Sequence, residues 1–209
     1  MPDRVVIAFD TAAAHCAAAL LCGDSIVASR IEKMPRGQAE RLMGLLQDML
    51  DEGGLGWPDV TRIGVGVGPG NFTGIRISVA AARGLALGLG VPAVGVSTHE
   101  ALAFGAAGPV LVATAAPRER IYLQADDRLS LCAADELPDL PRGAVCIGDR
   151  AEIPAHTCGG TIARPAHPLA EAIARIAATR EVVPGTRPAP IYLRPADAAP
   201  ARPGPRIVA

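Results

Sequence analysis

Aromatic residues and lysine are almost absent from this chain of 209 residues. Phe, Trp and Tyr together make up 3% of it, and Lys33 is its one lysine. Half of the residues are nevertheless hydrophobic, which is enough to bury a core in which alanine does much of the filling. The length allows one large domain or two smaller lobes.

An excess of positive charge is missing as well. The formal net charge is −1, and the part expected to fold contains no dense basic stretch. Proteins that hold RNA by themselves usually present a basic face. We therefore do not expect this chain to be the main RNA-binding component of any complex it joins.

Spacings typical of metal, redox and membrane motifs are lacking too. The five cysteines include no C-x-x-C pair, and the four histidines include no pair four residues apart. We interpret the cysteines as small buried hydrophobes of a reducing compartment, and place His156 and Cys158 in a surface loop. The longest apolar run, residues 84–96, is too short to span a membrane, and no leader pattern opens the chain. We expect a cytoplasmic protein without membrane contact or bound metal.

Strand and helix patterns alternate in the first half of the chain. Apolar runs predict strands at residues 5–9, 16–22, 26–31, 63–67 and 91–96. Helical spacing of apolar residues predicts helices at 35–52, 74–88 and 98–104, the last capped by Ser97 and Glu100. The order βββαβαβα is that of one lobe of the actin-like ATPase (ASKHA) fold, a mixed sheet covered by helices.

Beyond a linker at residues 105–109 the pattern weakens. Strands are expected at 110–115, 121–125, 128–132, 144–147, 161–164 and 191–194, with one helix at 169–180. We therefore predict an α/β protein with an N-terminal lobe at residues 1–105 and a smaller C-terminal lobe at 106–194. Residues 195–209 are rich in Pro, Ala and Arg, and we expect a disordered tail there. Because the second lobe is so reduced, two equal lobes closing on ATP are not expected.

A glycine-rich turn at residues 66–74 joins the fourth strand to the second helix. Backbone N–H groups of such a turn can approach an anion at a helix N-terminus. No Gly-Lys-Ser/Thr follows, so the turn is not a P-loop, and it is not the G-x-G-x-x-G of dinucleotide folds. The spacing allows phosphate binding but favours a structural turn in which Asn71 or Thr73 caps the helix.

The helix after this turn is apolar almost all round. Gly74, Ser78, Ala81 and Gly88 form a row of small residues, which permits close approach of another helix. Such a helix has to be covered on two sides, by its own sheet and by a second helix or another protein. The short second lobe favours a protein interface.

Asp10 and Thr11 end the first expected strand. In this fold class a carboxylate at that point can hold magnesium through water, and the neighbouring hydroxyl can face phosphate. Asp and Thr also form turns without any ligand. The residues alone leave both interpretations open.

These motifs together resemble the bacterial TsaB (YeaZ) family. Its patterns D-T-A/S, P-R before the first helix, and G-x-G-P-G-S/N-F-T-G-hydrophobic-R match residues 10–12, 35–36 and 66–76. GVSTHEALA from Gly95 and PAPIYLR at residues 188–194 are also similar to the family. The resemblance is strong over residues 4–105 and sparse afterwards.

The resemblance implies a non-catalytic subunit that supports TsaD, the transferase that places a threonylcarbamoyl group on adenosine 37 of tRNA. It implies binding to TsaD through the two helices of the first lobe, with the ATPase TsaE joining the complex. It also implies self-association through the same surface and tRNA contact only within the complex. No intrinsic cofactor is implied, but ATP or ADP with magnesium could lie at the interface with TsaD, with Asp10 and Thr11 as candidate ligands. The expected partner surface consists of Arg41, Leu45, Gly70, Phe72, Thr73, Gly74, Arg76, Ser78, Ala81 and Leu85.

Several positions depart from the family pattern. Where TsaD has two metal-binding histidines this chain has only His99, which supports a non-catalytic role. Gln38 stands where many relatives have histidine. The run AAPRERIY at residues 115–122 replaces D-A-R-x-G-E-hydrophobic-Y, with Ala115 and Pro117 in place of the acid and the arginine.

Two other functions compete with the scaffold hypothesis. An independent ASKHA-type ATPase or kinase is one, and the missing second-lobe motifs argue against it. A metalloprotease is the other, and the absence of a histidine pair argues against that.

Overall fold

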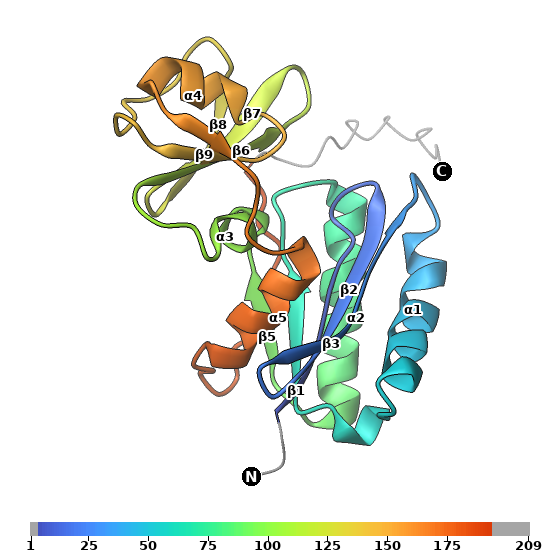
Figure 1. Ribbon diagram of the computed structural model, residues 1–209. Helices are drawn as coiled ribbons and strands as arrows, with labels where there is room; N and C mark the ends of the chain where they lie inside the picture. The colour runs from blue at the N-terminus through green and yellow to red at the C-terminus, as the bar shows by residue number, and fades with distance from the viewer. Residues whose placement is uncertain (1–3, 194–209) are drawn as a thin grey trace, which may run out of the picture.

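Two five-stranded sheets organise the computed structural model, which describes residues 4–193 (Figure 1). The first sheet has antiparallel pairing from β3 to β1 and parallel pairing from β1 to β5. Its strands are, in spatial order, β3 (Ser25–Lys33), β2 (His15–Cys22), β1 (Val5–Asp10), β4 (Arg62–Gly66) and β5 (Ala93–Val96). The mixed sheet and the five strands of the first lobe were predicted correctly.

Helices cover both faces of this sheet. The helices α1 (Gln38–Glu52) and α2 (Phe72–Leu89) lie on one face, and the short α3 (Thr98–Ala103) follows β5. Because β1 is buried on both sides, its successive residues face different cores. Ile7 and Phe9 pack with α1 and α2, whereas Val6 and Ala8 pack with the helix on the opposite face. The three helices predicted for the first lobe are confirmed.

The helix on the opposite face is α5 (Leu169–Thr179), which comes from the far end of the sequence. Its Ile173 and Ala177 pack directly on Gly64 of β4. The Arg62 guanidinium donates hydrogen bonds of 2.6 and 2.7 Å to the carbonyl oxygens of Ala177 and Arg180, which caps the helix C-terminus. The chain thus returns to the first lobe, which the prediction of a second lobe over residues 106–194 did not foresee. An alanine-rich helical pattern does not reveal which sheet the helix covers.

The second sheet builds the smaller lobe at the top of Figure 1. Its strands are, in spatial order, β10 (Thr161–Ala163), β9 (Val145–Ile147), β6 (Val110–Ala115), β7 (Arg120–Ala125) and β8 (Arg128–Ala133). The helix α4 (Glu152–Cys158) packs on it through Ala155 and Cys158, which are buried with Cys146 of β9. The expectation of a surface loop at His156 and Cys158 was wrong, because Pro154 lies in the first turn of the helix, where proline is tolerated.

The expected last strand at residues 191–194 is absent from its described part, residues 191–193. Ile191 instead donates one backbone hydrogen bond of 2.9 Å to the carbonyl oxygen of Val67. Arg194 and the expected disordered tail at 195–209 lie outside the described residues. All five cysteines are free thiols, and Cys16, Cys146 and Cys158 are buried, as predicted. Cys22 and Cys132 are half-buried.

Length and composition alone would allow α2 to cross a membrane, although the core helix of a soluble protein passes the same test. In this structure α2 packs along β4, and its Ile75, Val79 and Ala82 are buried there. The same helix leaves Leu87 83% exposed. It is therefore covered on one side only.

A strained turn connects β6 to β7. Arg118 and Glu119 have φ angles of 63° and 57°, in the left-handed region that favours glycine. At both positions the Cβ makes this conformation unfavourable. We predict that Glu119→Gly raises the free energy of unfolding by about 1 kcal/mol, as measured by urea denaturation.

The control for this prediction is Glu119→Ala. Alanine removes the carboxylate but keeps the Cβ that makes a positive φ unfavourable. It should therefore leave the stability nearly unchanged. If alanine stabilises the protein as much as glycine does, the gain comes from the lost charge, and backbone strain at Glu119 is excluded.

Candidate functional site

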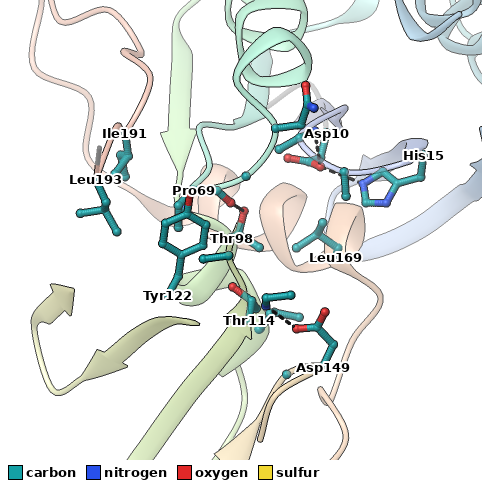
Figure 2. Close-up of a pocket in the computed structure, with 18 of the residues that line it drawn as sticks. Asp10, His15, Pro69, Thr98, Thr114, Tyr122, Asp149, Leu169, Ile191 and Leu193 are labelled. Carbon is teal, nitrogen blue, oxygen red and sulfur yellow. Dashed lines mark hydrogen bonds and ion pairs between the residues drawn. The ribbon is translucent and has the colours of Figure 1, made fainter. Parts of the chain in front are cut away.

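A cavity of about 1440 Å³ lies between the two lobes and is lined by residues of both (Figure 2). The first lobe contributes the end of β1, the turn before α2 and the start of α3. The second lobe contributes β6, β7 and the turn after β9. The segment 162–165 and Leu169 also line the cavity, and so do Ile191, Tyr192 and Leu193 at the C-terminal end of the described chain. This cleft is the place where the predicted nucleotide ligands can be tested.

Asp10 ends β1 at the edge of the cleft and is 1% exposed. Its Oδ1 accepts a hydrogen bond of 3.0 Å from the backbone N–H of Ala12 and lies 2.8 Å from Nε2 of His15. Its Oδ2 has no hydrogen-bond partner and packs so closely against Gly66 that any Cβ there would collide with it. Among residues 4–193 no group of three or more His, Cys, Asp or Glu residues could hold a metal ion. One unpaired oxygen alone does not make a magnesium site.

Thr11 serves the fold. Its Oγ1 donates a hydrogen bond of 2.7 Å to the carbonyl oxygen of Gly74, and the residue is fully buried. This bond ties the end of β1 to the first turn of α2. The hydroxyl is therefore not free to face a phosphate group.

The glycine-rich turn packs against the end of β1 in the same way. The backbone N–H of Asn71 donates a hydrogen bond of 2.7 Å to the carbonyl oxygen of Ala12. A Cβ at Gly70 or Gly74 would collide with the carbonyl oxygens of Ala12 or Thr11. The side chain of Asn71 caps α2, since its Oδ1 accepts from the N–H of Gly74 at 2.9 Å.

These contacts favour the structural interpretation of the turn. Its glycines allow the close approach of the chain itself, and the N–H groups of Asn71 and Gly74 are already bonded. The turn is therefore held in place by contacts within the chain. Of the two predicted capping residues, Asn71 is confirmed and Thr73 is not the cap.

The opposite wall of the cleft is formed by α3, β6 and β7. The Oγ1 of Thr98 donates a hydrogen bond of 3.3 Å to the carbonyl oxygen of Pro69, and the phenol ring of Tyr122 points toward the same proline in Figure 2. The Oδ1 of Asp149 accepts a hydrogen bond of 2.9 Å from the backbone N–H of Ala115. Asp149 thus anchors the β6 end from the neighbouring turn.

His99 joins the two lobes behind this wall. It is fully buried, and its Nε2 lies 3.1 Å from the carbonyl oxygen of Tyr122 and 3.3 Å from Oγ1 of Thr114. Nδ1 has no hydrogen-bond partner. Burial lowers the pKa of His99 to about 4, so the ring is neutral near pH 7. His99 is an interlobe contact that is closed to solvent.

Gln38 and Arg41 of α1 are also engaged within the chain. Nε2 of Gln38 donates to the carbonyl oxygen of Met34 at 3.1 Å, close to the helix start. The Arg41 guanidinium binds Glu32 through two hydrogen bonds of 2.8 and 2.7 Å and Asp48 through one of 2.9 Å. The hydrogen bond from Arg41 lowers the pKa of the Glu32 carboxyl. Arg41 is half-buried and still borders the surface.

Three residues of the expected partner surface point inward. Leu45, Gly74 and Ser78 are buried within the chain, so the expectation that they contact a partner needs correction. The Oγ of Ser78 lies 3.1 Å from the carbonyl oxygen of Gly66, on the sheet side of α2. Of the row of small residues predicted from the sequence, Gly74 and Ser78 are buried, Ala81 is half-buried and Gly88 is exposed. Gly70, Thr73 and Arg76 are exposed, and Arg41, Phe72, Ala81 and Leu85 are half-buried.

A different row of α2 faces outward. Ala80, Gly84, Leu87 and Gly88 are exposed, and a Cβ at Gly84 or Gly88 would meet nothing within 4 Å. The four-residue spacing of Ala80, Gly84 and Gly88 is visible in the sequence, but only Gly88 belonged to the predicted row of small residues. Tyr192, which contacts Arg76 and Phe72 at the start of α2, was not predicted, because no local pattern connects residues so far apart.

Residues 26–146 match the family model described as TsaD, tRNA N6-adenosine threonylcarbamoyltransferase. The chain is similar to the tRNA threonylcarbamoyladenosine biosynthesis protein TsaB of Escherichia coli K12, with 41% identity over 101 residues. This match covers 48% of the chain and 43% of the relative. The TsaB protein of Bacillus subtilis 168 is 34% identical over 98 residues, again over 47% and 43% of the two chains. The matches thus span less than half the length of these relatives.

Solved structures agree on the fold. YeaZ from Pseudomonas aeruginosa superposes with a TM-score of 0.56 and 29% identity, over 69% of this chain and 75% of that one. A Pseudomonas aeruginosa protein described as similar to the peptidase YeaZ has a TM-score of 0.74 and 24% identity. That superposition covers 91% of this chain and all of the other, and at this identity it supports the fold alone.

Proposed function

Because the chain belongs to the TsaD family, as a member of its TsaB (YeaZ) branch, we propose that it is a non-catalytic subunit that binds a TsaD-type transferase. In this role it supports the formation of threonylcarbamoyl-adenosine on tRNA. The observation that carries the proposal is the outward face of α2. This long helix is uncovered on one side, and a row of small exposed residues runs along that side. Such a face suits packing against another helix.

Charge on the two helices supports a partner of related structure. The helix α1 carries Glu40, Asp48, Asp51 and Glu52 against one arginine, whereas the only charged residues of α2 are Arg76 and Arg83. A second pair of such helices, related to the first by a two-fold rotation, would place its acidic helix against the basic helix of this chain and its basic helix against the acidic one. A TsaD-type paralogue with the same two helices fits this requirement. A second copy of the chain would use the same surface, which is the expected self-association.

The cleft supports a role without chemistry of its own. Thr11 and the glycine-rich turn are bonded within the chain, and His99 is buried between the lobes. We therefore place the transferase site on the partner. ATP or ADP with magnesium, where it takes part, would take its phosphate ligands mainly from the partner. The ATPase TsaE and tRNA would meet this chain only within the cytoplasmic complex.

The basic experiment mixes the purified chain with a bacterial TsaD homologue and measures the mass by light scattering. A stable 1:1 complex is expected. The chain alone should catalyse neither threonylcarbamoyl transfer nor phosphoryl transfer. Failure to form any complex would remove the scaffold function. ATP hydrolysis or phosphoryl transfer by the pure chain would instead favour the independent ATPase.

A bulky residue on the outward face of α2 tests where the partner binds. We predict that Gly84→Trp weakens the complex roughly 100-fold, because the indole would hold the two helices apart. Since nothing lies within 4 Å of a Cβ at Gly84, the isolated chain should keep its circular dichroism and unfolding midpoint. Affinity can be measured by calorimetry.

The matched control is His156→Trp, a tryptophan at an exposed position of α4 in the other lobe. It should leave the affinity unchanged. If both variants lower the affinity for the partner equally, or if neither lowers it, α2 is excluded as the docking helix. Ser78→Trp is not a useful test of the interface, because Ser78 is fully buried and its replacement would disturb the fold.

A further inference from the structure

The C-terminal end of the described chain lies beside α2. Nε of Arg83 donates a hydrogen bond of 2.8 Å to the carbonyl oxygen of Pro188. Pro188 also lies within 3.3 Å of a Cβ placed at Gly95. The backbone N–H of Ile191 donates to the carbonyl oxygen of Val67 at 2.9 Å. These contacts fix residues 188–191 along the flank of the first lobe.

Tyr192 continues this contact onto the first turn of α2. Its ring lies 4.9 Å from that of Phe72, measured between centroids, and its hydroxyl accepts a hydrogen bond of 3.0 Å from Nε of Arg76. Cζ of Arg76 lies 3.7 Å from the centroid of the Phe72 ring. The guanidinium is thus held by a ring and a hydroxyl at once. Tyr192 remains 43% exposed, which is unusual for a large residue with so many contacts.

The helical geometry of α2 shows what this contact borders. At about 100° per residue, Arg76 and Arg83 lie along one edge of the outward row that contains Ala80 and Gly84. Ala81 and Leu85 lie along the other edge, where they pack on the core shared with α1. The outward row therefore runs between α1 on one side and residues 188–192 on the other. A helix laid along this row would touch both.

We infer that residues 188–192 form one rim of the partner-binding surface, with Tyr192 as an anchor and Arg76 as the contact for a carboxylate of the partner. The inference rests on the proposed function and extends its surface beyond α1 and α2. Arg76 forms no ion pair with any acid among residues 4–193, so its terminal nitrogens have their donors available. An arginine held flat by a ring loses little freedom when it binds a carboxylate through two parallel hydrogen bonds. Tyr and Arg are also, with Trp, the residue types enriched among interface hot spots.

The test measures the affinity of the full chain for a TsaD homologue by calorimetry in four variants. Tyr192→Ala, which removes ring and hydroxyl, should weaken the complex roughly tenfold or more. Tyr192→Phe keeps the ring and loses the hydrogen bond, and a smaller loss is expected. Arg76→Gln should weaken the complex and also reduce its dependence on salt. Val183→Ala is the control, since Val183 is 65% exposed and lies outside the rim.

The outcomes separate this inference from the proposed function. If the unmodified chain binds, and Tyr192→Ala and Arg76→Gln both bind with the same affinity, the proposed rim is wrong. The scaffold function would then still hold. No binding by the unmodified chain would overturn both. Changes confined to self-association, with the complex unaffected, would assign the rim to a second copy and also overturn the inference. Tyr192→Phe is the decisive variant if Tyr192→Ala lowers the unfolding midpoint.

Discussion

Gly74→Ala should lower the free energy of unfolding by about 3 kcal/mol or more. The added methyl group would collide with the carbonyl oxygen of Thr11, which is backbone and cannot move aside as a flexible side chain could. Relief would require α2 to move away from the end of β1, and this would also break the hydrogen bond from Thr11 to Gly74. Urea denaturation followed by circular dichroism at pH 7 measures the loss.

The same helix offers a matched control in Gly84→Ala. The position is exposed, no atom lies within 4 Å of the added Cβ, and alanine favours a helix over glycine by about 1 kcal/mol. This variant should therefore stabilise the protein slightly. The two substitutions are chemically identical, so opposite signs would show that close packing requires Gly74. Equal effects would mean that the turn does not press on Thr11 as the structure describes.

This pair of glycines also shows where sequence reasoning reaches its limit. A glycine that allows a phosphate to approach and a glycine that allows another backbone to approach look the same in a sequence. The positions of the Ala12 and Thr11 carbonyl oxygens show that at Gly70 and Gly74 the approaching group is the chain's own backbone. The sequence could predict the position of the turn, but not which group packs against its glycines.

Local patterns predicted the elements of the fold better than their partners in space. Apolar runs located the strands because β1 and its neighbours are buried on both faces, and the period of α1 reflects its single buried side. The side of α2 that faces the sheet was misjudged at Ser78, because small residues occur on both sides of that helix. The packing of α5 on β1 and of Tyr192 on Arg76 joins segments more than 100 residues apart. No short-range pattern carries that information.

Acid should destabilise the protein through His99. Burial lowers its pKa to about 4 in the folded chain, whereas a histidine in the unfolded chain titrates near 6.5. Between these values the unfolded chain takes up a proton that the folded chain does not. Stability is therefore complete above the unfolded pKa and falls as the pH drops toward the folded pKa. The expected loss from pH 7 to pH 5 is about 2 kcal/mol, and about 3 kcal/mol by pH 4, measured by urea denaturation at each pH.

His99→Gln separates this effect from the titration of carboxyl groups. The amide can still donate a hydrogen bond to the carbonyl oxygen of Tyr122 but cannot take up a proton in this range. The variant should be less stable at pH 7, yet its stability should vary much less between pH 7 and pH 5. A pH dependence as steep as that of the unmodified chain would mean that His99 is not sealed between the lobes. Because its Nδ1 has no hydrogen-bond partner within the described chain, protonation there would leave a buried charge that Asp149 offsets only in part, and the lobes would have to separate to hydrate it.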